Sequence, residues 1–211
     1  MSNTKTQSVG TIATIAISLY VAFQIFSDIL STKIGLLPII NLAVDGGTII
    51  YPLTFTVRDF VHKTLGKEMA RKVVVLAASL NVVMVILFWI VGQMPQDEYW
   101  GLQDSYEAIL MPVWRITLAS IVAEVFSELI DTEVFSRAYK RWNDVIAVLA
   151  SNFIALIIDS LIFCILAFYG QLPTKTVLEI ILVNILVKGI MSLVSAPVIR
   201  LIPREAELKE I

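Results

Sequence analysis

The chain has almost no histidine or cysteine and carries little charge. Among its 211 residues are one histidine, His62, and one cysteine, Cys164, and 16% of the residues are charged, whereas soluble domains are usually about a quarter charged. A single cysteine cannot form an intrachain disulfide, and one histidine without a CxxC or HExxH pattern argues against a zinc site. A Walker A loop and a GxSxG nucleophile elbow are also missing. We therefore expect no enzyme of these types and no cofactor.

Apolar residues dominate what is present. They make up 57% of the chain, and the mean hydropathy is +0.82. This composition predicts an all-α membrane protein, a six-transmembrane-helix bundle in one domain over 1–211. The net charge of −2 gives no indication of a nucleic-acid partner. The first ten residues are polar and lack a signal-peptide cleavage pattern, so we expect the first apolar run to be retained.

Six apolar runs are candidate membrane spans. They cover Thr11–Leu30, Gly47–Val61, Val73–Gly92, Ile116–Ile130, Val145–Phe168 and Val177–Ile199. Roughly 20 residues are needed to cross the hydrocarbon core, and the first, third, fifth and sixth runs reach that length. The second is short and contains Pro52, and the fourth is interrupted by acidic residues. Both could be re-entrant or broken instead of full crossings.

Basic residues alternate between the loops. They gather after the second, fourth and sixth runs, at Lys63, Lys67, Arg71 and Lys72, at Arg137, Lys140 and Arg141, and at Arg200, Arg204 and Lys209. The loop over 93–111 has four acids and neither Lys nor Arg. Because Lys and Arg accumulate on the cytoplasmic side, the alternation predicts six crossings of the cell (inner) membrane with both termini in the cytoplasm.

The two halves of the chain show a short internal similarity. Residues 24–34 align without gaps on residues 124–134, and the same offset of 100 residues places Asp59 over Asp159. Three spans per unit would make 11–92 and 115–200 inverted repeats, a common plan in transporters. Chance similarity between two apolar sequences is the alternative.

Several predicted spans carry polar residues at helical spacing. These are Gln24 and Asp28 in the first, Arg58 and Asp59 in the second, Glu124, Glu128 and Asp131 in the fourth, Asn152 and Asp159 in the fifth, and Asn184 and Lys188 in the sixth, with Arg115 at the start of the fourth. An ionisable residue at the centre of a membrane helix costs about 2.5–3.5 kcal/mol on insertion scales, so such residues usually face an interior and have a function. Structural salt bridges and headgroup contacts are the alternative interpretation.

The segment Gly46–Val74 contains a YPLTF run, Tyr51–Phe55, then Asp59 and a Gly-Lys-x-x-Ala-Arg turn. Together with FSDILSTKI at Phe26–Ile34 and the segment Trp114–Phe135, it resembles the signature of the queuosine precursor transporter family, also called the vitamin uptake transporter family. The resemblance implies uptake of 7-cyano-7-deazaguanine or a related deazapurine by a solitary carrier. Many members of that family have Asn at the position of Asp28 and Gln at that of Glu128, which puts the substrate more in question than the fold.

The polar residues suit such a solute. A carboxylate can accept the adjacent ring N–H and amino group of a guanine-like edge, and an amide or a cation can contact ring nitrogens or the carbonyl. The candidate substrate-binding residues are Glu124, Glu128, Asp159, Asn152, Asn184, Lys188, Arg115, Gln24 and Phe23, the last as an aromatic cover. The candidates for coupling or gating are Asp28, Arg58, Asp59 and Asp131, with proton coupling as a hypothesis.

Two other functions remain open from the sequence. The first is a membrane subunit that binds a substrate and docks on a separate ATP-driven module, although the Ala-x-x-x-Ala docking face of such subunits is missing from the first span. The second is a membrane protein that transports nothing, such as a lipid-modifying enzyme or an assembly factor. A chain this small could also act as a homodimer, for which no segment identifies an interface.

Overall fold

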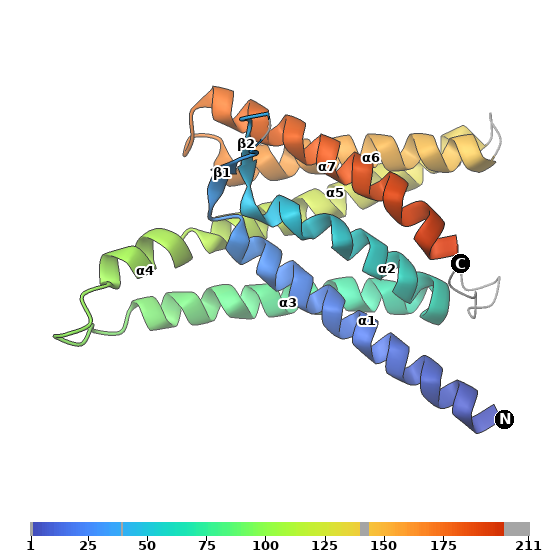
Figure 1. Cartoon of the computed structure of the whole chain (residues 1–211), viewed down its shortest axis with the longest axis horizontal. Coiled ribbons are helices and arrows are strands. Elements are labelled where there is room, and N and C mark those ends of the chain that lie inside the picture. Colours follow the sequence, from blue (N-terminus) through green and yellow to red (C-terminus); the bar gives the residue numbers. More distant parts are fainter. Residues whose placement is uncertain (1, 39, 140–143, 201–211) are drawn as a thin grey trace.

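The computed structural model describes residues 2–38, 40–139 and 144–200, and over these residues the chain is mainly helical (Figure 1). The elements are α1 (Ser2–Leu30), β1 (Ile34–Leu36), β2 (Ala43–Asp45), a 3-10 helix η1 (Gly46–Ile49), α2 (Tyr51–Leu65), α3 (Lys67–Gly92), α4 (Gln103–Leu110), α5 (Val113–Tyr139), α6 (Asp144–Phe168) and α7 (Thr174–Arg200). This architecture agrees with the predicted all-α membrane class. The β1–β2 hairpin and α4 are additions that the sequence did not predict.

Three stretches of the described residues are long and apolar enough to cross a membrane. They are Ala13–Leu30, Glu68–Gly92 and Gln103–Ile130, and the apolar helix Asn152–Phe168 is shorter. A helix, α1–α3 or α5–α7, covers each of the six predicted spans, and six crossings remain a prediction. The fourth span is not broken at its acids, because α5 is one helix of 27 residues that continues past Glu124 and Glu128.

The connections separate into two ends of the molecule. Figure 1 shows the N-terminus, the turn between α2 and α3, and the last residues of α7 at one end. The hairpin, α4 and the connection from α6 to α7 lie at the opposite end. Gly66 joins α2 to α3 with a φ of 85°, a conformation that glycine adopts without steric cost. Arg71 and Lys72 follow that turn. The first group of basic residues, which the sequence predicts to face the cytoplasm, therefore lies at the end of the molecule that carries the N-terminus.

Helix α2 is too short to cross the hydrocarbon core alone. Its 15 residues span about 22 Å at 1.5 Å per residue, and Pro52 lies at its start, where a missing N–H removes no helical hydrogen bond. The hairpin and η1 precede it, and η1 packs on the end of α1. A Cβ atom on Gly47 would lie 2.7 Å from the Ser27 carbonyl oxygen. The glycine therefore allows the backbone of η1 to lie directly against α1.

Two apolar cores hold the helices in two groups of three. One core joins α1, α2 and α3. It consists of Ala16, Tyr20, Val61, Ala70, Val73 and Ala77. The other joins α5, α6 and α7 through Ile116, Ala119, Cys164, Ala167, Phe168, Val177, Ile180 and Ile181, and includes Ala43 of the hairpin. We call these groups the first half and the second half; η1 and Asp45, which caps it, belong to the first, and Ala43 of the hairpin packs in the second.

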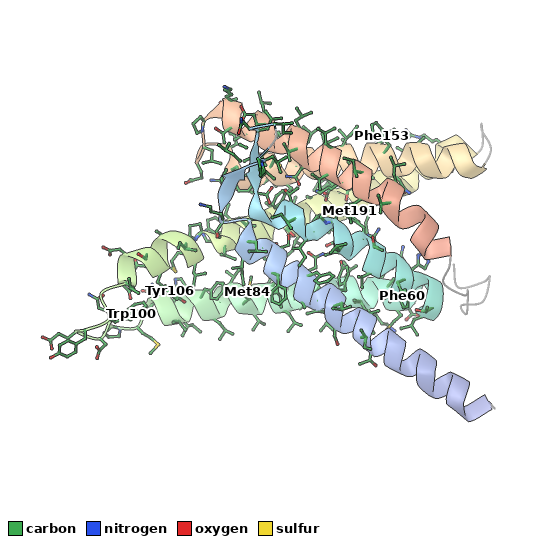
Figure 2. All side chains as sticks on the ribbon, in the orientation of Figure 1. Phe60, Met84, Trp100, Tyr106, Phe153 and Met191 are labelled. Carbon is green, nitrogen blue, oxygen red and sulfur yellow. The ribbon has the colours of Figure 1, made fainter. Side chains whose placement is uncertain are left out.

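The short helix α4 is fixed to the end of α3. Gln103 Nε2 donates to the Gly92 carbonyl oxygen at 3.0 Å, and the Tyr106 hydroxyl donates to the Phe88 carbonyl oxygen at 3.1 Å. The first bond pairs a carbonyl group at the end of a helix, which has no partner within the helix itself. Tyr106 and Trp100 lie at this end of the molecule, and Phe60 lies toward the other (Figure 2).

Candidate functional site

The polar side chains of the spans meet where the two halves face each other. The Thr117 hydroxyl on α5 donates to Asp28 Oδ2 on α1 at 2.7 Å. Asn184 Nδ2 on α7 donates to Asp45 Oδ1 in β2 at 2.8 Å. Lys188 Nζ on α7 lies 4.6 Å from the centre of the Tyr51 ring on α2. Each of these contacts joins one half to the other, whereas the packing within each half is largely apolar.

A small cavity lies in the middle of this polar interface. Its walls contain the carboxylates of Asp28 and Asp45, the Lys188 ammonium, the Asn184 amide, the aromatic rings of Tyr51 and Phe163, the hydroxyls of Ser27, Ser31, Thr48 and Ser120, and the backbone at Gly47. The free volume is about 10 Å³, room for about one water molecule. The side chains thus leave no room at this site for anything larger than a water molecule.

Asp45 is the centre of a complete hydrogen-bond network. Its Oδ2 atom accepts from the Ser31 hydroxyl at 2.9 Å and from the Thr48 backbone N–H at 3.1 Å. Its Oδ1 atom accepts from the Thr48 hydroxyl at 2.7 Å and from Asn184. Four donors compensate a carboxylate that is 1% exposed. Asp45 therefore joins α1, η1 and α7 at the cavity and caps η1.

Lys188 and Asp159 form a buried ion pair beside the cavity. Lys188 Nζ lies 2.5 Å from Asp159 Oδ2, and the two side chains are 1% and 4% exposed. The ammonium also lies 6.0 Å from the centre of the Phe163 ring, within the range of a cation–π contact. The pair lets an ionised lysine face the cavity without leaving a buried charge unbalanced.

A second polar cluster lies one helical turn away from the cavity. On α1, Gln24 precedes Asp28 by four residues, and on α5, Glu124 follows Ser120 by four. The Tyr20 hydroxyl connects the two helices, since it donates to Glu124 Oε1 at 3.0 Å and accepts from Gln24 Nε2 at 3.0 Å. This cluster, like the cavity, bridges the two halves.

A more exposed ion pair follows along α5. Arg58 Nη1 lies 3.0 Å from Glu128 Oε1, with the side chains 26% and 47% exposed, and the Arg58 guanidinium lies 5.6 Å from the centre of the Phe55 ring. The polar interface is therefore most buried near the hairpin and becomes more accessible toward the end of the molecule that carries the α2–α3 turn.

The sequence-predicted residues do not all meet at this interface. Asp28, Asn184 and Lys188 line the cavity, Asp159 contacts Lys188, and Gln24 and Glu124 form the second cluster. Phe23 is half-buried on α1, and Asn152 is exposed on α6. Arg115 donates from Nε and Nη2 to the carbonyl oxygens of Leu166 and Tyr169, both at 2.6 Å, at the end of α6. The side chains of Asp59 and Asp131 lie outside the described part of the chain.

The sequence analysis missed Asp45, Tyr20 and Tyr51 as site residues. Asp45 lies between the predicted spans, in the sequence Ala43-Val-Asp-Gly-Gly47, so a search for charges inside apolar runs passes over it. Tyr20 lies four residues before Gln24, so the two side chains share one helical face. Tyr51 opens the YPLTF run. The spacing of Tyr20 and the position of Tyr51 in the YPLTF run were both visible in the sequence and could have identified these two residues.

Apolar helices and a buried polar interface between two groups of three helices define a multi-pass membrane protein with an enclosed polar site. Residues 45–202 match the family model described as "Putative vitamin uptake transporter". The chain therefore belongs to the vitamin uptake transporter family, and it is a membrane transporter, not an enzyme.

Two relatives carry a more specific name. A "Probable queuosine precursor transporter" of Bacillus subtilis is 27% identical over 155 residues, which are 72% of this chain and 68% of the relative. A protein of the same name from Haemophilus influenzae is 28% identical over 127 residues, 58% of this chain and 51% of that relative. The chain thus matches about half the length of the second relative. No solved structure matches the chain significantly.

Proposed function

We propose that this protein imports a queuosine precursor, 7-cyano-7-deazaguanine or a related deazapurine, by alternating access. The observation that carries the proposal is the polar interface between two apolar halves, with a closed cavity at its centre. The names of the two relatives supply the class of solute. In carriers built from two similar units, the solute site lies where the units meet, and access alternates as one unit rocks against the other.

The chemistry of the cavity fits a flat, polar heterocycle. Tyr51 and Phe163 provide aromatic surfaces for the faces of the ring. Lys188 and Asn184 can donate to a ring carbonyl, and Asp28 can accept from ring N–H groups. Asp45, with four donors already, holds the hairpin and α7 in place. A single chain supplies all of these residues, so the proposed site needs no second copy.

The closed cavity defines the movement that the proposal requires. A volume of about 10 Å³ holds water but not a bicyclic base, so the two halves must separate to admit the solute. The contacts that open are those between Asp28 and Thr117 and between Tyr20 and Glu124, whereas β2 stays on α7 through Asp45 and Ala43. Each half keeps its own apolar core during this movement, in agreement with the proposed inverted repeats, 11–92 and 115–200, inside one domain.

The proposed orientation follows from the basic loops. The end of the molecule with the N-terminus and the α2–α3 turn faces the cytoplasm, and the hairpin and α4 face the outside of the cell (inner) membrane. The hairpin then covers the cavity from the outside. Its β2 strand is bound to α7, because Glu179 Oε2 accepts from the Ala43 N–H at 3.0 Å.

Uptake into liposomes tests the proposal directly. Purified protein is reconstituted, and entry of labelled 7-cyano-7-deazaguanine is compared with entry into protein-free liposomes and into liposomes that carry the Asp28→Leu variant. We expect saturable uptake by the wild type and loss of uptake in the variant. Well-folded wild-type protein that gives no uptake above the protein-free control would refute the proposed substrate.

A further inference from the structure

Two buried amide oxygens in the first half have no hydrogen-bond partner among the described residues. They are Gln24 Oε1 on α1 and Asn81 Oδ1 on α3, and the two residues are 4% and 3% exposed. Leaving a buried acceptor unpaired is unfavourable, and native proteins rarely do so without a functional reason. Neither atom borders the cavity described above.

The hydrogen bonds around Tyr20 determine which atom of Gln24 stays unpaired. A phenol has one proton to donate, and the Tyr20 hydroxyl donates it to a carboxylate oxygen of Glu124 at 3.0 Å. Gln24 must therefore present its amide nitrogen to the Tyr20 oxygen, as it does at 3.0 Å. The carbonyl oxygen of Gln24 then has to find a donor elsewhere.

Asn81 lies at the same level of the bundle as Gln24. Helices α1 and α3 run in the same direction along the molecule (Figure 1), and Tyr20 and Ala77 belong to the same apolar core. Gln24 lies one turn beyond Tyr20, and Asn81 lies one turn beyond Ala77. Glu124 joins the same level through its bond to Tyr20. Three acceptor groups from three helices therefore gather in one layer.

We propose that Gln24, Asn81 and Glu124 form an acceptor layer that selects the amino-substituted edge of the transported heterocycle. The inference rests on the proposed function and adds to it an orientation and a specificity residue, Asn81. A ring N–H next to an exocyclic amino group offers three protons on one edge, and amide and carboxylate oxygens only accept here. The layer would therefore bind 2-amino heterocycles more tightly than analogues without that group.

The position of the layer gives the solute an orientation. Gln24 is one turn from Asp28 on α1, and Glu124 is one turn from Ser120 on α5, so the layer and the cavity are successive levels of one interface, about 5–6 Å apart. In a guanine-like base the carbonyl and the 2-amino group lie on either side of the ring N–H, on one edge. With this edge along the interface, its carbonyl end would contact Lys188 and Asn184, and its amino end would reach Gln24 and Asn81.

Binding to the purified full-length protein tests this orientation. The probes are 7-cyano-7-deazaguanine and its analogue without the 2-amino group, and affinity is measured by calorimetry for the wild type, Asn81→Leu and Gln24→Met. Gln171→Met is the matched control, because it removes a side-chain amide from an exposed position after α6. Thermal unfolding without a probe is followed by labelling of the one cysteine, Cys164, which is 0% exposed in the folded protein.

We expect the wild type and Gln171→Met to prefer the amino compound by about tenfold or more, and Asn81→Leu and Gln24→Met to lose most of that preference. Without a probe, Asn81→Leu should unfold at the same temperature as the wild type or higher, because it removes an unpaired buried acceptor. A merely structural asparagine would give the opposite result, a lower unfolding temperature and an unchanged preference.

Four results would overturn the inference. If the wild type binds both probes equally, the acceptor layer does not read the amino group, although the proposed transport function stands. If Asn81→Leu and Gln24→Met keep the wild-type preference, the layer is not formed by these residues. If sodium chloride stabilises the wild type but not Asn81→Leu when no probe is present, the layer binds a cation instead. A wild type that binds neither probe would refute the inference and the proposed substrate together.

Discussion

Lys188 Nζ and Asp159 Oδ2 lie 2.5 Å apart in a part of the protein where both side chains are almost completely buried. The lysine lines the cavity and the aspartate does not. A buried ion pair contributes little net stability compared with apolar residues, but removing one partner leaves an uncompensated charge. Substitutions of this pair can therefore distinguish two effects: the stability of the helices, and the presence of a cation at the proposed solute site.

The single variants Lys188→Met and Asp159→Leu should each destabilise the protein by about 3–5 kcal/mol. The double variant should unfold near the wild-type temperature, because it leaves no unpaired charge, and it should still fail to take up solute, because the cavity has lost its ammonium group. Thermal unfolding followed by Cys164 labelling and uptake by liposomes measure the two effects. A double variant less stable than both single variants would show that the pair itself stabilises the fold.

Replacement of Asp45 should detach the hairpin from α1 and α7. Asp45→Ala leaves the hydroxyls of Ser31 and Thr48, the Thr48 N–H and the Asn184 amide without their common acceptor, and each unpaired buried group costs about 1–3 kcal/mol. We expect a loss of several kcal/mol and faster labelling of Cys164. The control is Asp97→Ala, whose carboxylate accepts from the Tyr99 N–H in an exposed loop, and it should change the unfolding temperature little.

Gly47 should not tolerate a methyl group. A Cβ there would overlap the Ser31 hydroxyl oxygen and lie 2.7 Å from the Ser27 carbonyl oxygen, which is backbone and cannot rotate away. Overpacking of this kind costs about 1–3 kcal/mol. Gly35→Ala in β1 is the matched control, because a Cβ there has nothing within 4 Å and Gly35 is not among the residues with positive φ. Equal unfolding temperatures for the two variants would contradict the close packing of η1 on α1.

Some of this site could be predicted from the sequence because helical spacing is a local property. Gln24 and Asp28, or Asn184 and Lys188, are four residues apart, so each pair must share a helix face wherever the helix lies. The hairpin could not be predicted in this way, since its two strands have three residues each and are fixed by contacts with α1 and α7. Asp45 was missed for the same reason, because its role depends on Asn184, which is distant in the sequence.

Arg115 shows the limit of counting charges in apolar segments. Its position at the start of a span suggested a substrate contact, but its guanidinium contacts two carbonyl groups at the end of α6. Those carbonyls have no partner within the helix. A sequence cannot distinguish an arginine that binds a solute from one that pairs with a helix end, because both need the same fork of N–H donors.

Arg115 should consequently contribute to stability and not to affinity. Arg115→Ala should lower the stability of the protein by about 1–3 kcal/mol, since two carbonyl groups lose charge-assisted hydrogen bonds. The KM for uptake of labelled 7-cyano-7-deazaguanine should stay at the wild-type value. Trp114→Ala, at an exposed neighbouring position, controls for truncation at this end of α5. A large rise in KM for Arg115→Ala with an unchanged unfolding temperature would mean that Arg115 contacts the solute.

The two ends of the molecule should react from opposite sides of the membrane. Cys164 is buried, so a new cysteine reports on its own position without removal of the native one. Asp104→Cys in α4 and Lys72→Cys after the α2–α3 turn both replace exposed residues. Lys72 makes a surface ion pair with Glu68, worth about 0–1 kcal/mol.

With an impermeant maleimide, we expect Asp104→Cys to react in intact cells and Lys72→Cys to react only after the membrane is opened. Because α3 connects the two positions, reaction of both cysteines from the same side would mean that α3 does not cross the membrane, and reaction in the reverse pattern would mean that the hairpin covers the cavity from the cytoplasm.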